Sequence, residues 1–427
     1  MFVRVFGLCL SLLVSAVSLH AQQLFSANPN PVQPHAGLVA LFGGEPSARV
    51  RQTTLNTNYF VNTFNNAQGD LTINLFPDVV VTSKRSVVTN PGQGRYTWRG
   101  TVEGANFYGR AVLAIVGNQI AGTVQKDGKV FLIRPVSDSV QVISEVNQTN
   151  FPDEAEPIDP DLSNARFRFA SHAKASRPQL VKTNSTYTIK VMLVFPDGLG
   201  LACSGPIFPF AGWLRPLVEL IYESNLNDVW NAFMTDTIIA DVTIYCSTYV
   251  SAGVMEDDLD WVSTDATVAT ERDARNADLV SLLVSSGSYC GLGQVNEPVD
   301  AADDDDVFSV VKTSCGLSNY SLAHELGHNM GLDHDRYVEA DGATSTQCGF
   351  GYVITVNGTM TGRDAMAYET ACTDAGTTCP RIGAYSYDLT VSLGGLTIVF
   401  GQPCTDADAA SNVRVFADAV PIVESFR

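Results

Sequence analysis

Short runs in which hydrophobic and polar residues alternate fill the stretch from Leu71 to Ile143. Alternation with a period of two is typical of strands that bury one face, and turn-forming residues such as NPGQG and KDG separate the runs. The runs are LTINLF, RYTWRGTV, AVLAIV, QIAGTV, KVFLIRP and SVQVI. Because strands joined by such short turns pair with their neighbours in sequence, the pattern predicts a small antiparallel β domain.

The pattern changes in the second half of the chain. Hydrophobic runs there, YTIKVMLVF, IIADVTIYCSTYV and DLVSLLVS, have the length and composition of strands. They alternate with two predicted helices, residues 210–233, where apolar residues recur every three or four positions, and the run TDATVATERDARNA. Strands that alternate with helices indicate an α/β sheet, which we predict for a second domain over residues 183–427.

The stretch between these two domains has no hydrophobic period. Its first part, FPDEAEPIDPDLSN, is acidic and rich in proline, and its second part, RFRFASHAKASRPQLVK, is basic. Such a stretch is expected to pack poorly and to expose its backbone to proteases. We therefore predict a β-rich domain over residues 22–150 and a cleavable linker over residues 151–182.

The first residues have the organisation of an export signal. MFVR carries a positive charge, VFGLCLSLLVSAVSL is a short apolar run, and LHA precedes polar residues. We predict a signal peptide over residues 1–21. No later segment reaches the roughly 18 apolar residues of a membrane helix, so we expect a secreted protein without a membrane anchor.

The cysteines agree with export. Once Cys9 is removed with the signal peptide, eight cysteines remain, all of them from Cys203 onward, and an even number favours disulfide bonds. Zinc ligation by thiolates would call for close C-x-x-C pairs, and the sequence has none. We expect four disulfides, with Cys290 bound to Cys315 and Cys203 bound to Cys246, and the other pairings stay open.

The formal net charge of −19 argues against two classes of partner. An acidic surface repels nucleic-acid phosphates and anionic membranes at neutral pH, so we expect neither as a partner. The acidic run from Asp303 to Asp306 has the oxygen ligands that calcium prefers. A run of like charges is more often a solvated loop, which is the reading we favour.

Three of the six histidines lie within the run SLAHELGHNMGLDHD. If this run is helical, His324 and His328 project from one face, about 6 Å apart along the axis, and can bind one metal ion. Glu325 lies one residue further round, where its carboxylate can reach a metal-bound water and act as a base. Gly331 permits the left-handed turn that ends a helix, and the reversed chain brings His334 to the metal. Three nitrogen ligands with one open position describe a catalytic zinc site.

The run HELGHNMGLDH resembles the H-E-x-x-H-x-x-G-x-x-H signature of the metzincin zinc endopeptidases. Asp335, directly after the third histidine, resembles the mark of the reprolysin or adamalysin branch, and Met366 in DAMAYE resembles the methionine turn beneath the zinc. TERDARNADLVSLLV, CPRIGAYSY and SNVRVFADAVPIVESFR are similar to further family segments. The β domain looks like the propeptide of secreted bacterial reprolysin-like proteases.

The resemblance implies an α/β metzincin-type catalytic domain, with a twisted mixed sheet, helices and a zinc cleft, preceded by a small antiparallel β propeptide domain. It implies a secreted zinc-dependent endopeptidase, made as a zymogen, that cuts proteins or peptides, and we expect a monomer. The site residues would be the zinc ligands His324, His328 and His334, the general base Glu325, and Gly331, Asp335 and Met366 as structural support.

Two features depart from the family. Many family propeptides block the zinc with a cysteine, but residues 21–202 contain none, and acidic linker residues such as Asp153 or Glu154 are one alternative. Tyr368 lies two residues after Met366, as does the tyrosine that approaches the zinc in the astacin and serralysin branches. It either acts in catalysis or packs beside the turn.

Two other functions remain to be distinguished from proteolysis. A metzincin-like pseudoenzyme would keep its zinc but only bind a partner through its cleft, and loss of Glu325 or of a histidine would favour it, yet all four residues are present. A zinc amidase would use the same site on cell-wall peptides. A digest of unfolded protein compared with one of peptidoglycan would separate the amidase from the endopeptidase.

Overall fold

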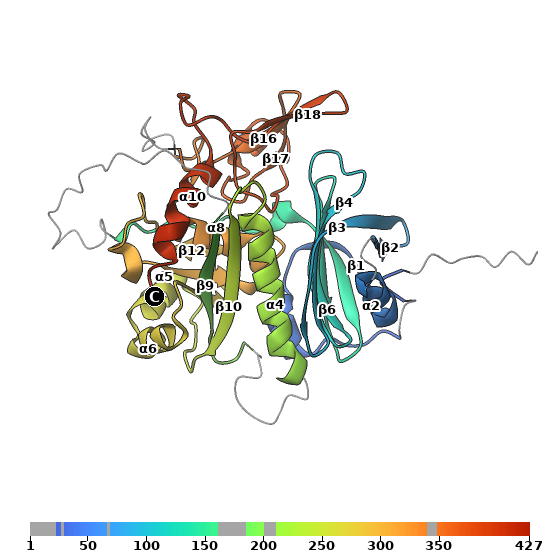
Figure 1. Cartoon of the computed structure of the whole chain (residues 1–427). Coiled ribbons are helices and arrows are strands. Elements are labelled where there is room, and N and C mark those ends of the chain that lie inside the picture. Colours follow the sequence, from blue (N-terminus) through green and yellow to red (C-terminus); the bar gives the residue numbers. More distant parts are fainter. Residues whose placement is uncertain (1–22, 27–29, 66–68, 161–184, 200–210, 340–347) are drawn as a thin grey trace, which may run out of the picture.

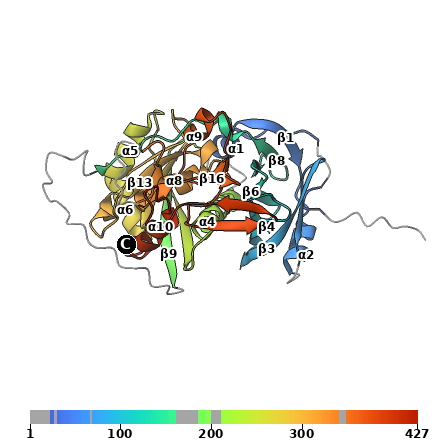
Figure 2. The ribbon, with the colours of Figure 1, turned by 90° about the horizontal axis from the view of Figure 1, so that it is seen from above.

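The computed structural model describes residues 23–26, 30–65, 69–160, 185–199, 211–339 and 348–427 (Figure 1). The predicted signal peptide and the whole second part of the predicted linker therefore lie outside the described residues. Two sheets make up the body of the molecule, one in each half of the chain, and helix α4, Ala211–Trp230, lies between them (Figures 1 and 2).

The first sheet has eight strands, and every neighbouring pair is antiparallel. Its order is β1-β8-β7-β6-β5-β4-β3-β2. The strands are β1 Ser47–Thr53, β2 Leu71–Phe76, β3 Val79–Gly92, β4 Arg95–Val102, β5 Gly109–Val116, β6 Gln119–Lys126, β7 Lys129–Pro135 and β8 Gln141–Val146. Two helices, α1 Ala36–Phe42 and α2 Thr57–Asn65, accompany the sheet. The predicted antiparallel β domain is confirmed, and β1 and β3 are strands that the pattern did not reveal.

Both faces of this sheet are buried, which explains the continuous hydrophobic run in β5. Leu113 and Ile115 belong to a core within the β domain, whereas Val112 and Ala114 belong to a core shared with the second half of the chain. Helix α4 packs on β4, β5 and β6 across this shared core. The two halves are therefore joined by a continuous apolar interface.

The second sheet is mixed, as predicted, with the order β10-β9-β11-β13-β12. Its strands are β9 Thr186–Phe195, β10 Thr237–Cys246, β11 Leu279–Val284, β12 Gly291–Gly293 and β13 Phe308–Lys312. All pairs are parallel except β12 with β13, so β12 is a short antiparallel strand at the edge.

Helices cover both faces of the second sheet. Alternate residues of β9 enter two different cores, with Val191 and Leu193 on the side of α4 and Met192 and Val194 on the other side. Helix α8, Ser321–Asn329, and helix α10, Asn412–Val423, join α4 on the first face. Helices α5, Met255–Thr264, and α6, Ala266–Arg275, cover the second face.

The C-terminal part of the chain adds a small four-stranded sheet next to α8 and α10 (Figure 1). Its strands are β16 Val353–Val356, β17 Thr359–Arg363, β18 Thr390–Leu393 and β19 Leu396–Val399. A separate pair is formed by β14, Asp333–Asp335, and β15, Phe350–Gly351. Helices α7, Thr313–Gly316, and α9, Thr370–Asp374, are single short turns.

The described residues contain the disulfides Cys290–Cys315, Cys348–Cys404 and Cys372–Cys379. The first confirms a predicted pair, and the other two settle pairings that were open. The predicted bond between Cys203 and Cys246 involves Cys203, which lies outside the described residues. No helix in the described part of the chain is long and apolar enough to cross a membrane.

The acidic run at residues 303–306 does not have the surroundings expected of a calcium site. It forms the short 3-10 helix Asp303–Asp305, where Asp304 and Asp305 form ion pairs with Arg427 at 2.7 and 3.2 Å. The carboxylates of these two residues are thus neutralised by a guanidinium, and the structure adds no support for calcium.

Candidate metal centre and active site

Helix α8 positions the first two histidines of the motif. It packs on β11, β12, β13 and α4, and every one of its residues is buried. His324 and His328 project from one face toward the C-terminal part of the chain. The helix ends at Asn329, and two residues later Gly331 has φ +81°, a conformation that a residue with a side chain rarely adopts. This turn leads into β14, which carries His334, as the sequence predicts.

The three histidines converge on one point. The Nε2 atom of His328 lies 3.1 Å from the Nε2 atoms of both His324 and His334, and all three side chains are fully buried. The Nδ1 atoms face acceptors instead: the carbonyl of Ala365 at 2.9 Å for His324 and that of Leu332 at 2.8 Å for His328.

This hydrogen bonding fixes which ring nitrogens are free. An Nδ1 atom that faces a carbonyl oxygen must carry the hydrogen, so the Nε2 atoms of His324 and His328 present lone pairs. The Nδ1 atom of His334 is held in the same way by the carboxylate of Glu339, at 3.0 Å. Three buried Nε2 atoms that meet at this distance can bind one cation together, so the arrangement is a metal site.

The pKa values of the histidines differ with their surroundings. Burial, with charge repulsion between the rings, lowers the pKa of His324 and His328 well below its usual range, which favours the neutral form that binds metal. Burial also lowers the pKa of His334, but the carboxylates of Glu156 and Glu339 outweigh it and raise that pKa to about 9.

Glu325 lies against the edge strand. A side chain on Gly291 would collide with its carboxylate, and one on Gly293 would come within 2.9 Å of Oε2, so these glycines leave room for Glu325. Both carboxylate oxygens are buried and have no hydrogen-bond partner among the described residues. Burial raises the pKa of Glu325 well above its usual range, and the nearby carboxylate of Glu154 raises it further.

The turn beneath the histidines is held by two aspartates. Asp364 accepts hydrogen bonds from the backbone N–H groups of Met366 and Ala367, at 3.0 and 2.7 Å. Asp335 accepts one from the backbone of Tyr368, at 2.8 Å. The Met366 sulfur packs so closely under α8 that a Cβ on Gly327 would lie 2.7 Å from it. Asp364 was missed from the sequence, although an aspartate two residues before a turn methionine is a recognisable turn signal.

Tyr368 reaches from this turn toward the histidines. Its ring centroid lies 4.3 Å from that of His334. Its hydroxyl donates a hydrogen bond to the backbone carbonyl of Glu154, at 2.9 Å. Burial raises the pKa of Tyr368, so the hydroxyl remains a donor across the accessible pH range.

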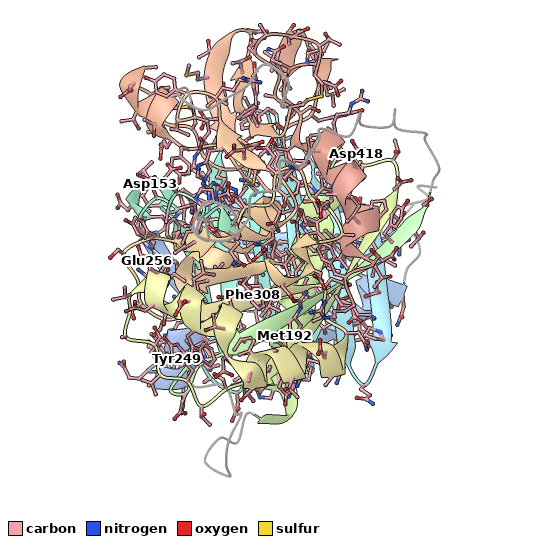
Figure 3. The ribbon with its side chains drawn as sticks, turned by 90° about the vertical axis from the view of Figure 1, so that its left-hand side faces the viewer. Asp153, Met192, Tyr249, Glu256, Phe308 and Asp418 are labelled. Carbon is pink, nitrogen blue, oxygen red and sulfur yellow. A yellow bond between two sulfur atoms is a disulfide. The ribbon has the colours of Figure 1, made fainter. Side chains whose placement is uncertain are left out.

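The peptide that Tyr368 contacts is part of the predicted linker. Residues 153–158, which we call the cleft segment, run parallel to β12 and add to the edge of the second sheet. Ala155 N donates to the Gly291 carbonyl and Ile158 N to the Gly293 carbonyl, both at 2.9 Å. In Figure 3, Asp153 lies where the C-terminal part meets the second sheet and α5.

The expectation that this part of the linker packs poorly is therefore wrong. It has no hydrophobic period because it pairs with the backbone of another element and does not form a sheet of its own. Arg381 and Asn319, which hold the side chain of Glu154, were also missed. Arg381 lies within the run CPRIGAYSY, but a lone arginine carries no pattern that marks it as functional.

Comparisons with known proteins agree with this geometry. Residues 218–335 match the family model of the metallo-peptidase family M12B, reprolysin-like. The chain is 27% identical over 334 residues to a peptidyl-Asp metalloendopeptidase of Xanthomonas campestris pv. campestris, with 77% of this chain and 72% of that protein covered. It is 28% identical over 330 residues to a peptidyl-Asp metalloendopeptidase of Stenotrophomonas maltophilia, with 74% and 70% covered.

A similarity to a solved structure was also found. Metalloproteinase-II from Bacteroides fragilis is 11% identical, with 64% of this chain and 83% of that chain covered, at a TM-score of 0.39. A TM-score this low does not establish a shared fold.

Proposed function

The chain is a metalloendopeptidase of the reprolysin-like family, and we propose that it is secreted as a zinc-dependent zymogen. Residues 1–21 would direct export, residues 22–150 would form the propeptide, and residues 183–427 the protease. The export pattern and the three disulfides among the described residues support secretion, since such bonds persist in oxidising compartments. The substrates are proteins or peptides, and the protein acts as a monomer.

Zinc fits the donor set. Three imidazoles, each with its Nδ1 atom hydrogen-bonded, match the ligand set of a catalytic zinc that keeps an open position. Zinc bound there polarises the scissile carbonyl and lowers the pKa of a bound water toward 7.

The observation that carries the proposal is the Glu325 carboxylate, which belongs to the residue after His324, is buried and has no hydrogen-bond partner among the described residues. We assign Glu325 the role of general base, which takes the proton of the attacking water and later returns it to the leaving amine. The Tyr368 hydroxyl would donate to the oxygen of the attacked carbonyl. Gly331, Asp335 and Met366 keep these groups in place.

The cleft segment supports latency without a cysteine. An extended peptide binds an open sheet edge through its backbone, and residues 153–158 already occupy the edge of β12 beside Glu325. The Tyr368 hydroxyl is also occupied, by the Glu154 carbonyl. We propose that substrate enters only after cleavage within the linker and departure of this segment.

The relatives support a preference for acidic residues. Both are named peptidyl-Asp metalloendopeptidases, and each alignment covers at least 70% of the relative. We propose that this protease also cuts its substrates beside an aspartate.

Replacement of Glu325 by Gln tests the function. The change keeps the size of the side chain but removes the base, so zinc content and folding should stay near normal while hydrolysis of a quenched peptide falls about 10²- to 10⁴-fold. Zinc content and hydrolysis are measured on the same sample. Undiminished hydrolysis would refute the role of Glu325, and attack on peptidoglycan without attack on unfolded protein would favour the cell-wall amidase.

A further inference from the structure

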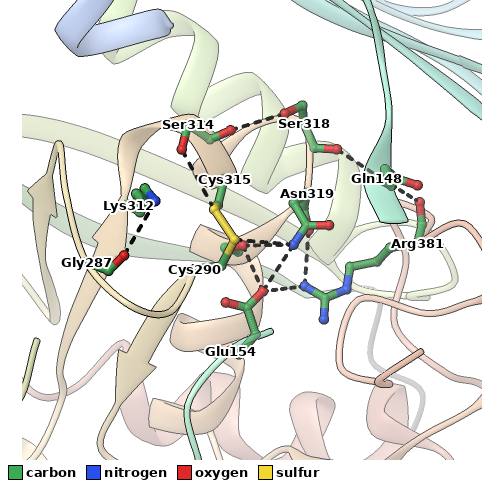
Figure 4. The surroundings of a disulfide bond; sticks show 11 residues. Gln148, Glu154, Gly287, Cys290, Lys312, Ser314, Cys315, Ser318, Asn319 and Arg381 are labelled. Atoms are coloured by element: carbon green, nitrogen blue, oxygen red, sulfur yellow. Dashed lines mark hydrogen bonds and ion pairs between the residues drawn. A yellow bond between two sulfur atoms is a disulfide. The ribbon is translucent and has the colours of Figure 1, made fainter. Parts of the chain in front are cut away.

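The side chain of Glu154 is buried among polar groups of the second domain. Its Oε1 atom accepts hydrogen bonds from Arg381 at 2.5 Å, from the Ser321 hydroxyl at 2.8 Å and from the Asn319 amide at 3.3 Å (Figure 4). The side chains of Glu154 and Arg381 are 0% and 2% exposed. We call Asn319, Ser321 and Arg381 the carboxylate pocket.

The pocket is built into the same elements as the metal site. Ser321 is the first residue of α8, three residues before His324, and the start of a helix favours an anion. Arg381 also donates to the carbonyl of Ala367, in the turn that carries Tyr368, at 3.4 Å. A side chain held in the pocket is thus close to the groups that act on a peptide bond.

The pocket is fixed by parts of the second domain. The backbone carbonyl of Asn319 accepts a hydrogen bond from Arg381, at 3.2 Å, and the backbone N–H of Asn319 donates to the Cys315 carbonyl, at 3.0 Å. The disulfide between Cys315 and Cys290 ties this turn to the end of β12 (Figure 4). Removal of the cleft segment would leave these supports in place.

The positive charge of the pocket requires an anion. Arg381 is almost fully buried, and a buried charge without a partner is strongly unfavourable. A second buried arginine, Arg363, adds positive charge nearby, and burial together with the charge of Arg381 lowers its pKa. Both line a cavity of about 280 Å³ between the second domain and the segment that precedes Glu154.

Glu154 does not use every donor of the pocket. The Nε atom of Arg381 is buried and has no hydrogen-bond partner among the described residues. A carboxylate that enters at another angle, or on a shorter side chain, can therefore be bound as well.

We propose that the carboxylate pocket binds the acidic side chain of the substrate, with Arg381 as the residue that determines specificity, and that Glu154 fills this pocket in the unprocessed chain. The Glu154 carbonyl on Tyr368 places the acidic residue next to the scissile bond. This inference rests on the proposed peptidase function. The proposal accounts for the buried arginine of the second domain. In the unprocessed chain, Glu154 occupies the position that the acidic side chain of the substrate would take.

The first test uses the processed protein and pairs of quenched peptides that differ only by Asp or Asn, with the acidic position scanned across the cut. The parent should cleave the Asp peptide with a kcat/KM about 10²-fold above that of its Asn partner. Arg381→Gln should bring this ratio to within a few-fold of one, mainly through loss on the Asp peptide. Arg414→Gln, at an exposed arginine, should leave the ratio unchanged. An arginine with only a structural role would lower both rates together, and an unchanged ratio in Arg381→Gln would overturn the proposal.

A second test does not depend on the folding of an Arg381 variant. A labelled synthetic peptide with the sequence of residues 151–160 should bind the processed protein, as measured by fluorescence anisotropy. The same peptide with Glu154→Gln should bind about 30-fold more weakly or worse. The control peptide with Asp153→Asn should bind within about three-fold, because the side chain of Asp153 is exposed.

The binding test also separates the two proposals, since it requires no turnover. If the protein prefers the peptide with Glu154 but hydrolyses no substrate, the proposed peptidase function is wrong and the proposed pocket stands. Equal binding of the Glu154 and Glu154→Gln peptides would refute the proposed role of the carboxylate pocket, whatever the protein hydrolyses.

Discussion

Replacement of Tyr368 by Phe removes one hydroxyl that the structure aims at a peptide carbonyl. The ring stays packed against His334, with centroids 4.3 Å apart, and the backbone N–H of Tyr368 remains bonded to Asp335. The hydroxyl donates to the neutral carbonyl of Glu154 at 2.9 Å, and such a bond contributes about 0.5 to 1.5 kcal/mol. A donor to the oxygen that becomes charged in the transition state is worth more, about 10²- to 10³-fold in kcat.

These two magnitudes give an unequal effect on kcat and KM. We expect Tyr368→Phe to lower kcat about 10²-fold and to change KM only a few-fold, in steady-state hydrolysis of a quenched peptide with metal content confirmed. The affinity of the variant for the peptide of residues 151–160 should fall only about 2- to 13-fold, which corresponds to one neutral hydrogen bond. A kcat within three-fold of the parent value would show that Tyr368 only packs beside the turn.

Other predictions concern processing and stability. Amino-terminal sequencing of the secreted, active protein should place the new terminus within residues 166–182. An active species that begins near residue 22 would show that the β domain remains part of the active enzyme. Replacement of both Cys290 and Cys315 by Ala removes a disulfide that spans 25 residues and should lower the free energy of unfolding, measured in urea, by about 3 kcal/mol. An unchanged midpoint of unfolding would contradict this. Burial, with Asp241 nearby, raises the pKa of Glu223 to about 7, so its ionisation opposes folding as the pH rises from about 4.5 to 7. Glu223→Gln should therefore raise the unfolding temperature at pH 8 but not at pH 4, and equal shifts at both would refute the assignment.

The sequence revealed those strands whose side chains either alternate between buried and exposed or are buried on both faces. The runs for β2, β4 and β7 coincide with the observed strands because their residues alternate or are buried on both faces. The missed β1 is an edge strand with the sequence SARVRQT, whose only buried residue is the last. β1 is held by backbone pairing with β8, while most of its side chains are partly or fully in solvent, so it carries no hydrophobic alternation.

The same reasoning explains which parts of the site were predicted. The metal ligands lie within eleven residues, and helix periodicity alone brings His324 and His328 together. Glu154 and Arg381 are 227 residues apart, and only the packing of the cleft segment on β12 joins them. The sequence offered Asp153 and Glu154 as equal candidates for a blocking acid. The structure favours Glu154, which is bound by an arginine and two polar side chains and not by the histidines.

The proposed latency would depend on more than the cleft segment. While the linker is intact, the segment competes with substrate at the high effective concentration of an attached ligand, and cleavage converts it into a separate molecule. Yet the β domain also shares an apolar core with α4, in which Val112 and Ala114 pack with Leu217 and Ile221. An interface of this kind would hold a cleaved β domain on the rest of the protein, so linker cleavage alone would leave the carboxylate pocket filled. Activity should therefore appear later than cleavage, at the rate at which the β domain dissociates or is itself degraded.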